Sequence, residues 1–452
     1  MTIAILGFGR EGQSLLKFLQ RPTTRRNLAK LIPALKSWGA AKPTIWILDK
    51  DPNLKIPRGL KSVLGKEYLD RLEQFDLIFR SPGISYRHKS IERALRLGKT
   101  VSSATKLFFD AADKIGAQII GVTGSKGKTT TATLIYEMLK SAKLNAHLGG
   151  NMGRPALDLL PKLKRKSWVV LELSSFQLQD LHVSPPIAVL LDVFPEHLDF
   201  HRSLAEYYAA KGNICRFQTA GNKAFYLGHN PITSWLAGTC KGQRIEVTER
   251  DFNLFTPADM QIRGQHHFRN AVIAARVAAA LGVKTEIIQQ TIRRFRGVVH
   301  RQEIVRETKG REGIIRWIND SASTNPHTAA AAVNAFRGTP HVLIAGGQDK
   351  NLDYRPLTET LRRSLDTKLV VLLGANREKI ARSLAGLPIH VVQVKNLRAA
   401  AEQAYRAIKK EPGEEKVILF SPGATSFDMF KNYAERGEQF KKVVASLTSS
   451  SK

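Results

Sequence analysis

The amino-acid sequence predicts an α/β protein with three domains, each built around a largely parallel sheet. Short, continuous apolar runs alternate with segments of helical periodicity, as in proteins whose buried parallel strands are joined by helices. Two glycine-rich loops, which start at Gly7 and Gly121, each stand between such a run and a helical segment. A chain of 452 residues has room for roughly two to four domains of ordinary size.

The first predicted domain, residues 1–101, has the pattern of a Rossmann-like dinucleotide-binding half. One apolar run precedes Gly7-Phe-Gly-Arg-Glu-Gly12, and the next run ends at Asp49. That acid follows the glycine loop by about forty residues, where about twenty is usual, and a basic insertion at residues 21–43 separates the two. From the motif alone, the glycine loop could bind a nucleotide, or its glycines could serve only to pack the helix closely against the sheet. Ser81-Pro-Gly-Ile84 follows a third run, at the end of a strand where ligand sites of α/β sheets lie.

The second predicted domain, residues 102–297, contains a loop that indicates nucleoside triphosphate binding. Gly121-Val-Thr-Gly-Ser-Lys-Gly-Lys-Thr-Thr-Thr131 stands between an apolar run and a helical pattern. Backbone N–H groups of such a loop and the positive end of the next helix face the phosphates. Lys128 is expected to reach the β- and γ-phosphates, and the Thr129 hydroxyl to bind Mg²⁺. The loop residues expected to bind ATP are Gly124, Ser125, Lys126, Gly127, Lys128, Thr129 and Thr130.

Metal ligands are expected where two further strands of this domain end. Glu172 lies near the end of the apolar run Trp168–Leu173, where a carboxylate suits a magnesium site better than a core. Another run, Ile187–Leu191, leads into Asp192-Val-Phe-Pro-Glu-His-Leu-Asp199, which is dense in oxygen and imidazole ligands. The structural alternative for His197 in this loop is a histidine with ordinary hydrogen bonds.

The third predicted domain, residues 298–452, is again Rossmann-like. Its apolar runs, Val342–Ala345, Leu369–Leu373 and Lys416–Phe420, alternate with helical segments. This alternation predicts a doubly wound, mainly parallel sheet.

The composition is that of a cytoplasmic enzyme. No run reaches the roughly 18 apolar residues of a membrane span, and the chain begins without a signal-peptide pattern. The two cysteines, Cys215 and Cys240, provide neither a disulfide framework nor a metal quartet. The net charge of +31 is spread along the chain, which fits solvated faces or an anionic substrate better than a stripe that binds nucleic acid.

Together these motifs resemble the Mur ligase superfamily, and along essentially the whole chain its D-glutamate-adding branch. The glycine loop has the compact form T-G-x-x-G-K-[ST], which resembles the ATP loop of Mur ligases and folylpolyglutamate synthases. The branch is indicated by motifs that occur in the family's order. They are Ser81–Ile84, the ATP loop, Gly149–Gly153, Leu171–Leu178, Glu196-His197, Tyr208–Lys211, His300-Arg301, Asn319–Asn325 and Ser421–Asp428.

The resemblance implies an ATP-dependent acid–D-amino-acid ligase of peptidoglycan precursor synthesis, which joins D-glutamate to UDP-N-acetylmuramoyl-L-alanine. ATP would first convert a carboxylate to an acyl phosphate, which an amine then attacks. Such phosphoryl transfer depends above all on positive charge and positioning. The resemblance implies two Mg²⁺ ions, one held by Thr129 and Glu172 and the other by His197 and a carbamylated Lys211. Without it, Lys211 is one solvated lysine among 70 basic residues.

The resemblance also implies which residues line each substrate. Positions near the adenosine and phosphates of ATP are His267, Asn270, Arg301 and Asp320. Positions near the nucleotide sugar are Asp49, Ser81, Gly83, Asn151, Ser174 and Gln177. Turn formation by Ser81–Gly83 and helix capping by Ser174 are the structural alternatives for two of these. Positions around D-glutamate are Thr324, Lys350, Ser426 and Tyr433. An active site between the second and third domains is expected, so that domain closure accompanies turnover.

Two positions depart from the family pattern. Ala322 stands where the family has a lysine, which removes a cation from the expected active site. His267 stands where the family has an asparagine that faces adenine. An imidazole can donate or accept one hydrogen bond, whereas an amide side chain can do both at once.

Three alternatives accompany this interpretation. The first is another ligase of the superfamily with a different amino acid or acceptor, and the second is a basic P-loop protein that acts on nucleic acid. The third is a degenerate homologue that binds without catalysis, which the presence of Lys128, Glu172, His197 and Lys211 disfavours. The expected partners are therefore small-molecule substrates, and the expected state is a monomer.

Overall fold

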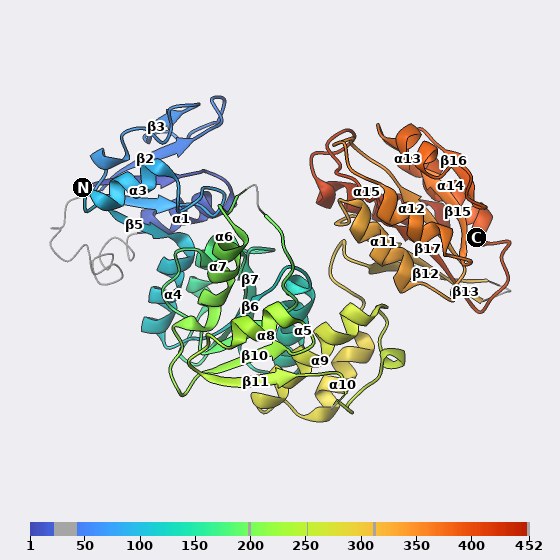
Figure 1. Cartoon of the computed structure of the whole chain (residues 1–452), viewed down its shortest axis with the longest axis horizontal. Helices are drawn as coiled ribbons and strands as arrows, with labels where there is room; N and C mark the ends of the chain where they lie inside the picture. The colour runs from blue at the N-terminus through green and yellow to red at the C-terminus, as the bar shows by residue number, and fades with distance from the viewer. Residues whose placement is uncertain (22–42, 198–199, 251, 311–312, 450–452) are drawn as a thin grey trace. The chain divides into compact units, whose positions relative to one another are not determined.

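The computed structural model describes residues 1–21, 43–197, 200–250, 252–310 and 313–449. Most of the basic insertion predicted at 21–43, together with Asp199 and residues 450–452, lies outside this range. In the part of the chain that is described, strands form three sheets, which confirms the predicted α/β fold (Figure 1). No helix of the described residues is long and apolar enough to cross a membrane.

The first sheet is parallel and has the strand order β3-β2-β1-β4-β5. Its strands are β1 (Thr2–Leu6), β2 (Thr44–Asp49), β3 (Lys61–Leu64), β4 (Leu77–Arg80) and β5 (Thr100–Ser103). The helices of this region are α1 (Arg10–Gln20) and α3 (Lys89–Arg96), with a 3₁₀ turn, η2 (Leu72–Gln74). Because β2 and β4 flank β1, Asp49 and Ser81 lie on either side of the glycine loop that follows β1.

The second sheet is also parallel and has the order β11-β10-β9-β6-β8-β7. Its strands are β6 (Gln118–Thr123), β7 (Ala146–Gly150), β8 (Trp168–Glu172), β9 (Ile187–Leu190), β10 (Lys223–Leu227) and β11 (Gln243–Val247). Its helices are α4 (Ala104–Ile115), α5 (Lys128–Ser141), α6 (Ser175–Leu178), α7 (Leu204–Arg216), α8 (Pro231–Ala237), α9 (Gln265–Ala280) and α10 (Thr285–Arg294). The short 3₁₀ turns are η3 (Ala156–Asp158), η4 (Leu160–Lys162) and η5 (Pro257–Asp259). Since β8 and β9 flank β6, the loops that follow these three strands meet at one edge.

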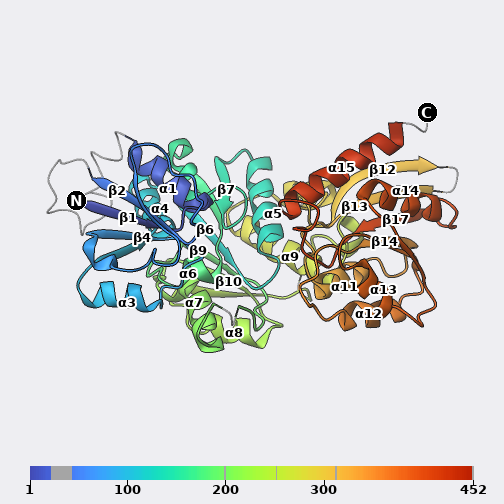
Figure 2. The same ribbon diagram turned by 90° about the horizontal axis from the view of Figure 1, so that it is seen from above.

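The third sheet is mixed, with the order β12-β13-β17-β14-β15-β16 and only β12 antiparallel to its neighbour among the described strands. The strands are β12 (Glu303–Gly310), β13 (Gly313–Asn319), β14 (His341–Ala345), β15 (Thr367–Leu372), β16 (His390–Gln393) and β17 (Glu415–Phe420). The helices are α11 (Pro326–Ala335), α12 (Arg355–Arg362), α13 (Arg377–Ser383), α14 (Leu397–Ile408) and α15 (Tyr433–Ser449). Helices α14 and α15 cover one face of the sheet, and α11, α12 and α13 cover the other (Figure 2).

The chain divides into two compact units. The first contains residues 1–252 and 269–291, and the second contains residues 253–268 and 292–452. The first two sheets share one unit because their helices bury a common apolar cluster, in which Leu15 and Leu19 of α1 join Leu157 and Val169. The three predicted domain boundaries stay a prediction.

A buried ion pair joins the first sheet to α6. The Arg80 guanidinium, at the end of β4, contacts the Asp180 carboxylate and donates to the carbonyl oxygens of Ile84 (2.7 Å) and Phe176 (2.9 Å). The side chains of Arg80 and Asp180 are 0% and 3% exposed. The sequence analysis did not predict this pair, because its members are a hundred residues apart.

Replacing Arg80 by methionine is expected to lower the free energy of unfolding by about 3–5 kcal/mol, because Asp180 would keep a buried charge without its partner. Chemical denaturation measures the change. The matched control is Arg93→Met, which removes an exposed pair with Glu73 and should cost no more than about 1 kcal/mol. Equal effects of the two substitutions would refute the structural role of Arg80.

The two cysteines form a disulfide, which the sequence analysis missed. Cys215 in the last turn of α7 is bonded to Cys240, three residues beyond α8, with a Cα–Cα distance of 4.8 Å. The sequence analysis expected that two cysteines would provide no disulfide framework, and the structure has one disulfide bond between them. A separation of 25 residues in sequence did not indicate a bond between the two cysteines, because only the packing of α7 against α8 brings them together.

Candidate active site

The ATP loop connects β6 to α5, as the sequence predicted, and its glycines are sterically required. Gly127 has φ +82° and caps the N-terminus of α5. A Cβ atom at Gly127 would lie 2.4 Å from Oδ1 of Asn270, and one at Gly124 would lie 2.7 Å from Cβ of Leu191. The loop therefore packs directly against Asn270, one of the residues expected near ATP.

Replacing Gly127 by alanine is expected to weaken binding of an ATP analogue at least about tenfold, because both the left-handed backbone and the contact with Asn270 exclude a Cβ. Titration calorimetry measures the change. Gly221→Ala is the control, since a Cβ there meets nothing within 4 Å. Unchanged affinity in Gly127→Ala would contradict the assignment of this loop.

Two lysines converge on the backbone of the ATP loop. Lys128 Nζ donates to the carbonyl oxygens of Gly124 and Ser125, both at 2.9 Å, and Lys211 Nζ donates to Gly124 O at 2.8 Å. Lys211 is only 2% exposed. Burial, and secondarily the charge of Lys128, hold the pKa of Lys211 well below its usual range. Lys211 is thus a buried amine beside the phosphate loop, and the interpretation as a solvated surface lysine is wrong.

Oxygen donors meet at the ends of β6 and β8. The Thr129 hydroxyl donates to Glu172 Oε2 at 2.7 Å, and Asn151 Nδ2 donates to Glu172 Oε1 at 2.9 Å. Glu172 is 3% exposed, so a carboxylate ends a strand inside the protein. Hydroxyl and carboxylate oxygens are the donors that Mg²⁺ prefers. Groups of three or more His, Cys, Asp and Glu side chains that could hold a metal ion are absent from the described residues, so Mg²⁺ binding here stays a prediction.

The loop after β9 is bound to the ATP loop. Ser125 Oγ donates to Phe194 O (3.0 Å), accepts from Phe194 N (2.8 Å), and lies 2.7 Å from the Tyr207 hydroxyl. His197 has φ +59°, and its ring lies 4.8 Å from that of Phe176 and 6.2 Å from that of Tyr207. The His197 side chain is 46% exposed and therefore accessible to a ligand. Tyr207 was not predicted, although it lies one helical turn before Lys211.

Several residues expected near the nucleotide sugar lie at the carboxyl edge of the first sheet. Phe8 N donates to Asp49 Oδ2 at 2.7 Å, and Ser81 Oγ donates to Gly7 O at 2.8 Å. Gly83 lines a cavity of about 430 Å³. Lys66, His88 and Lys89, which the sequence analysis did not single out, line the same cavity together with Asp70.

Two more of these residues, Ser174 and Gln177, lie at the start of α6 and have structural partners. Ser174 caps α6 by accepting from Gln177 N, so the capping alternative is observed. Gln177 Nε2 donates to Glu11 Oε1 at 2.6 Å. Burial raises the pKa of Glu11 to about 7, against smaller lowering effects of Gln177 and Arg80. A substrate role for Ser174 and Gln177 stays a prediction.

In the second unit, a buried carboxylate lies beside residues expected near ATP. Asp320 accepts from Ser421 Oγ at 2.7 Å and from Gln302 N at 3.2 Å, and burial nevertheless raises its pKa to about 7. His267 is 7% exposed, and burial together with the charges of His266 and Arg301 holds its pKa well below the usual range. Burial therefore favours the neutral form of the His267 imidazole.

The residues expected around D-glutamate lie on loops at the carboxyl edge of the third sheet. Thr324 follows β13, Lys350 follows β14, Ser426 follows β17, and Tyr433 begins α15. Lys350 Nζ is exposed and lies 5.3 Å from the Phe427 ring.

Arg436, which the sequence analysis missed, holds two of these loops together. Its guanidinium donates to Ser321 Oγ (3.0 Å), Ser321 O (2.8 Å) and Ala424 O (2.9 Å). Burial lowers the pKa of Arg436 to about 10. This buried cation supports the segment that contains Ala322, whose N–H donates to His300 O at 2.9 Å.

A phosphate loop with a converging lysine pair, oxygen donors for a divalent cation and a separate Rossmann-like sheet define an ATP-using α/β enzyme. Residues 122–278 match the Mur ligase middle domain, and residues 300–423 match the Mur ligase, glutamate ligase domain. The chain belongs to the Mur ligase family. This confirms the family and the class of activity expected from the sequence, an ATP-dependent ligase that forms amide bonds.

Proteins of similar sequence and solved structures of similar fold support this assignment. A protein named UDP-N-acetylmuramoylalanine–D-glutamate ligase from Acetivibrio thermocellus is 37% identical, and the match covers 86% of each chain. A protein of the same name from Geobacillus kaustophilus is 36% identical, and the match covers 86% of this chain and 88% of that one. A solved UDP-N-acetylmuramate-alanine ligase from Thermotoga maritima is 17% identical, with both chains fully covered and a TM-score of 0.56. A MurF ligase from the same organism, in complex with ADP, is 16% identical, with 89% of both chains covered and a TM-score of 0.55. The two structures support the fold.

Proposed function

We propose that this protein joins D-glutamate to UDP-N-acetylmuramoyl-L-alanine at the expense of ATP, in peptidoglycan precursor synthesis. The observation that carries the proposal is the meeting of half-buried Lys128 and buried Lys211 at the Gly124 carbonyl, beside Thr129 and Glu172. This arrangement places the Lys128 ammonium, a buried amine and hard oxygen donors where a triphosphate would lie on the loop. The names of the relatives described above supply the substrates.

The chemistry follows from the charge of the reactants. The alanine carboxylate attacks the γ-phosphorus of ATP, the bond to ADP breaks, and an acyl phosphate forms. The D-glutamate amine, after losing a proton, then attacks the acyl carbon, and phosphate leaves with one oxygen of the original carboxylate. Both steps bring anions together, so Lys128 and the loop N–H groups serve to neutralise charge and hold the phosphates in line.

We propose that the site binds two Mg²⁺ ions. Thr129 and Glu172 would hold the first, and His197 and a carbamylated Lys211 the second. Carbamylation needs a neutral amine, and the lowered pKa of Lys211 favours that form. Adding CO₂ with loss of a proton would convert this neutral amine to a carbamate, whose two oxygens share one negative charge next to the phosphate loop. When bound, the ions would supply Lewis acidity and screen the phosphate charges.

The other substrates are assigned by the chemistry of the residues. The cavity lined by Lys66, Lys89 and Gly83 suits the diphosphate of the UDP sugar, and Asp49 and Ser81 at the glycine loop would contact the uridine part. Lys350, Ser426, Thr324 and Tyr433 supply a cation and hydroxyl groups for the two carboxylates of glutamate. His267, Asn270, Arg301 and Asp320 would contact adenosine and phosphates. We further propose that the enzyme acts as a monomer in the cytoplasm, where its substrates occur.

A phosphate-release assay tests the proposal. With ATP, Mg²⁺ and UDP-N-acetylmuramoyl-L-alanine, release is expected to require D-glutamate and to stay at background with L-glutamate, L-lysine or D-alanine. A different amino acid in the panel supporting release would identify another ligase of the superfamily. Release that needs neither sugar nor amino acid would refute the ligase function.

A further inference from the structure

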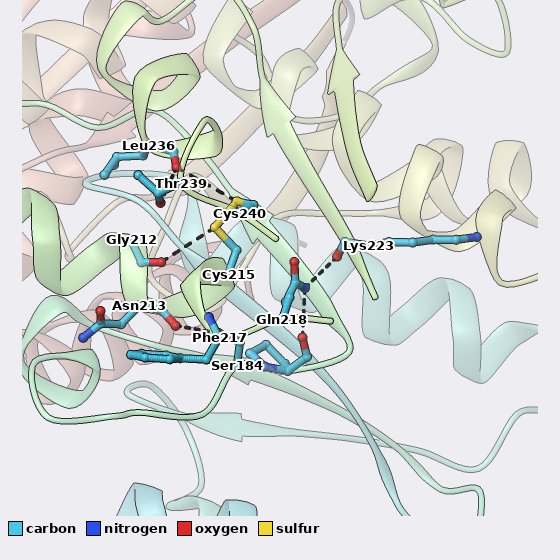
Figure 3. Close-up of a disulfide and its surroundings, with 11 residues drawn as sticks. Ser184, Gly212, Asn213, Cys215, Phe217, Gln218, Lys223, Leu236, Thr239 and Cys240 are labelled. Carbon is cyan, nitrogen blue, oxygen red and sulfur yellow. Dashed lines mark hydrogen bonds between the residues drawn. A yellow bond between two sulfur atoms is a disulfide. The ribbon is translucent and has the colours of Figure 1, made fainter. Parts of the chain in front are cut away.

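The disulfide connects the two helices that support the ATP site. Cys215 lies in α7, one turn after Lys211, and Cys240 follows α8 (Figure 3). The helices pack closely at Gly212, where a Cβ would lie 3.4 Å from Leu236 Cδ2. The bond therefore fixes the distance between helix ends that are already in contact.

Helix α7 holds the ATP loop from one side. Lys211 Nζ donates to Gly124 O at 2.8 Å, and the Tyr207 hydroxyl lies 2.7 Å from Ser125 Oγ. Both contacts come from the face of α7 that also carries Cys215, since residues four apart in a helix are neighbours. A displacement of α7 would move both contacts with the loop.

Helix α8 holds the loop that leads to His197. Thr233 Oγ1 donates to Leu191 O at 2.9 Å and accepts from Val193 N at 3.2 Å. Asn230, the N-cap of α8, donates through Nδ2 to Val193 O at 3.2 Å. A displacement of α8 would shift the loop that carries the predicted second metal ligand, so the disulfide braces both sides of the site.

The surroundings accommodate both the bonded and the reduced cysteines. Gly212 O lies 3.7 Å from Cys215 Sγ and Leu236 O lies 4.0 Å from Cys240 Sγ, so each thiol would have a carbonyl acceptor (Figure 3). The end of α7 is also held without the disulfide, because Ser184 Oγ donates to Asn213 O and accepts from Phe217 N. Cys215 is fully buried and Cys240 half-buried, so Cys240 is the more accessible of the two residues.

We propose that Cys215 and Cys240 form a reversible dithiol–disulfide switch that sets the affinity of the site for ATP, the bonded form binding more tightly. This regulation rests on the proposed function, because it acts on the ATP loop and the metal loop of that site. A disulfide in a cytoplasmic protein is more often transient and redox-sensing than structural.

The exchange partner is a protein or small-molecule dithiol. One thiolate of the partner attacks Cys240 Sγ, the S–S bond breaks, and Cys215 leaves as a thiolate that takes up a proton. The second thiol of the partner then resolves the mixed disulfide, which releases Cys240 as a thiol and leaves the partner oxidised. The reverse sequence, with the oxidised partner as electron acceptor, restores the bond in the protein.

Equilibrium binding of a non-hydrolysable ATP analogue with Mg²⁺ tests the proposal on the full chain. The protein is measured after oxidation by a glutathione disulfide buffer and after reduction by dithiothreitol, and mass spectrometry of alkylated thiols verifies each state. Reduction is expected to raise the Kd about three- to tenfold, with unchanged circular dichroism, and reoxidation to restore it. An equal Kd in the two states, or failure of the bond to form under oxidising conditions, would overturn the switch.

The variant Cys240→Ser separates the bond from other effects of the reductant. Its Kd is expected to equal that of the reduced protein in both buffers, because the half-buried position tolerates a hydroxyl. A Kd in Cys240→Ser that still responds to dithiothreitol would refute the assignment to this pair. The readout needs neither sugar nor amino acid, so an error in the proposed substrates would leave this result intact and appear only in the phosphate-release assay.

Discussion

Replacing Lys128 by alanine is expected to lower kcat by at least about 100- to 1000-fold, because the substitution removes a cation that stabilises charge on the transferring phosphoryl group. Lys128 is half-buried, and its ammonium donates to two carbonyl oxygens of its own loop, each at 2.9 Å. The fold should therefore persist. Phosphate release under saturating substrates measures the loss, and circular dichroism verifies the fold.

The matched control for this experiment is Lys140→Ala. Lys140 is an exposed lysine in the last turn of the same helix, and its ammonium lies 5.5 Å from the Tyr136 ring. Its removal changes the net charge equally and should leave activity within about twofold, because surface substitutions away from a site have small effects. Turnover of Lys128→Ala within tenfold of the unaltered protein would refute the role of Lys128 in phosphoryl transfer.

Replacing Lys211 by alanine is expected to lower kcat by about 100-fold or more, with partial recovery on addition of formate or acetate. If Lys211 is carbamylated, its loss removes anionic oxygens that a small carboxylate can replace in the space left by the side chain. The burial of Lys211 and its lowered pKa are the physical grounds, since a neutral amine is the form that reacts with CO₂. Activity is measured across a carboxylate titration at constant ionic strength.

The variant Lys211→Arg distinguishes a carbamate from a cation. Arginine keeps the positive charge but cannot be carbamylated under these conditions, so it should be as inactive as alanine. High activity of Lys211→Arg, or rescue of Lys211→Ala by methylamine instead of acetate, would show that position 211 acts as a cation.

Most interior strands were predicted from sequence, with β10 and β13 as exceptions, and the edge strands were not. Strands such as β8 and β14 are buried along nearly their whole length, and their continuous apolar runs are visible without a structure. Strands β3 and β16, in contrast, have no fully buried residue, so they carry no continuous run. The antiparallel edge strand β12 was missed for a related reason, since its sequence is largely polar.

Residues of the candidate site that are close together in sequence could be predicted, and those that only the fold brings together could not. The ATP loop is contiguous in sequence, so its glycines, lysine and threonine could be identified directly. The contact between Lys211 and Gly124 joins residues 87 positions apart, and its recognition depended on family resemblance. Arg80 and Arg436 escaped notice because an arginine in a basic chain carries no signal of burial, which only the packed structure supplies.

The measurement that tests the central claim most directly uses UDP-N-acetylmuramoyl-L-alanine labelled with oxygen-18 in the alanine carboxylate. The enzyme, ATP, Mg²⁺ and D-glutamate are added, and mass spectrometry follows both the sugar nucleotide and the released phosphate. The account predicts a product extended by one glutamyl residue and phosphate that carries one labelled oxygen from the carboxylate. Unlabelled phosphate, or phosphate release without the extended product, would contradict a ligase that works through an acyl phosphate.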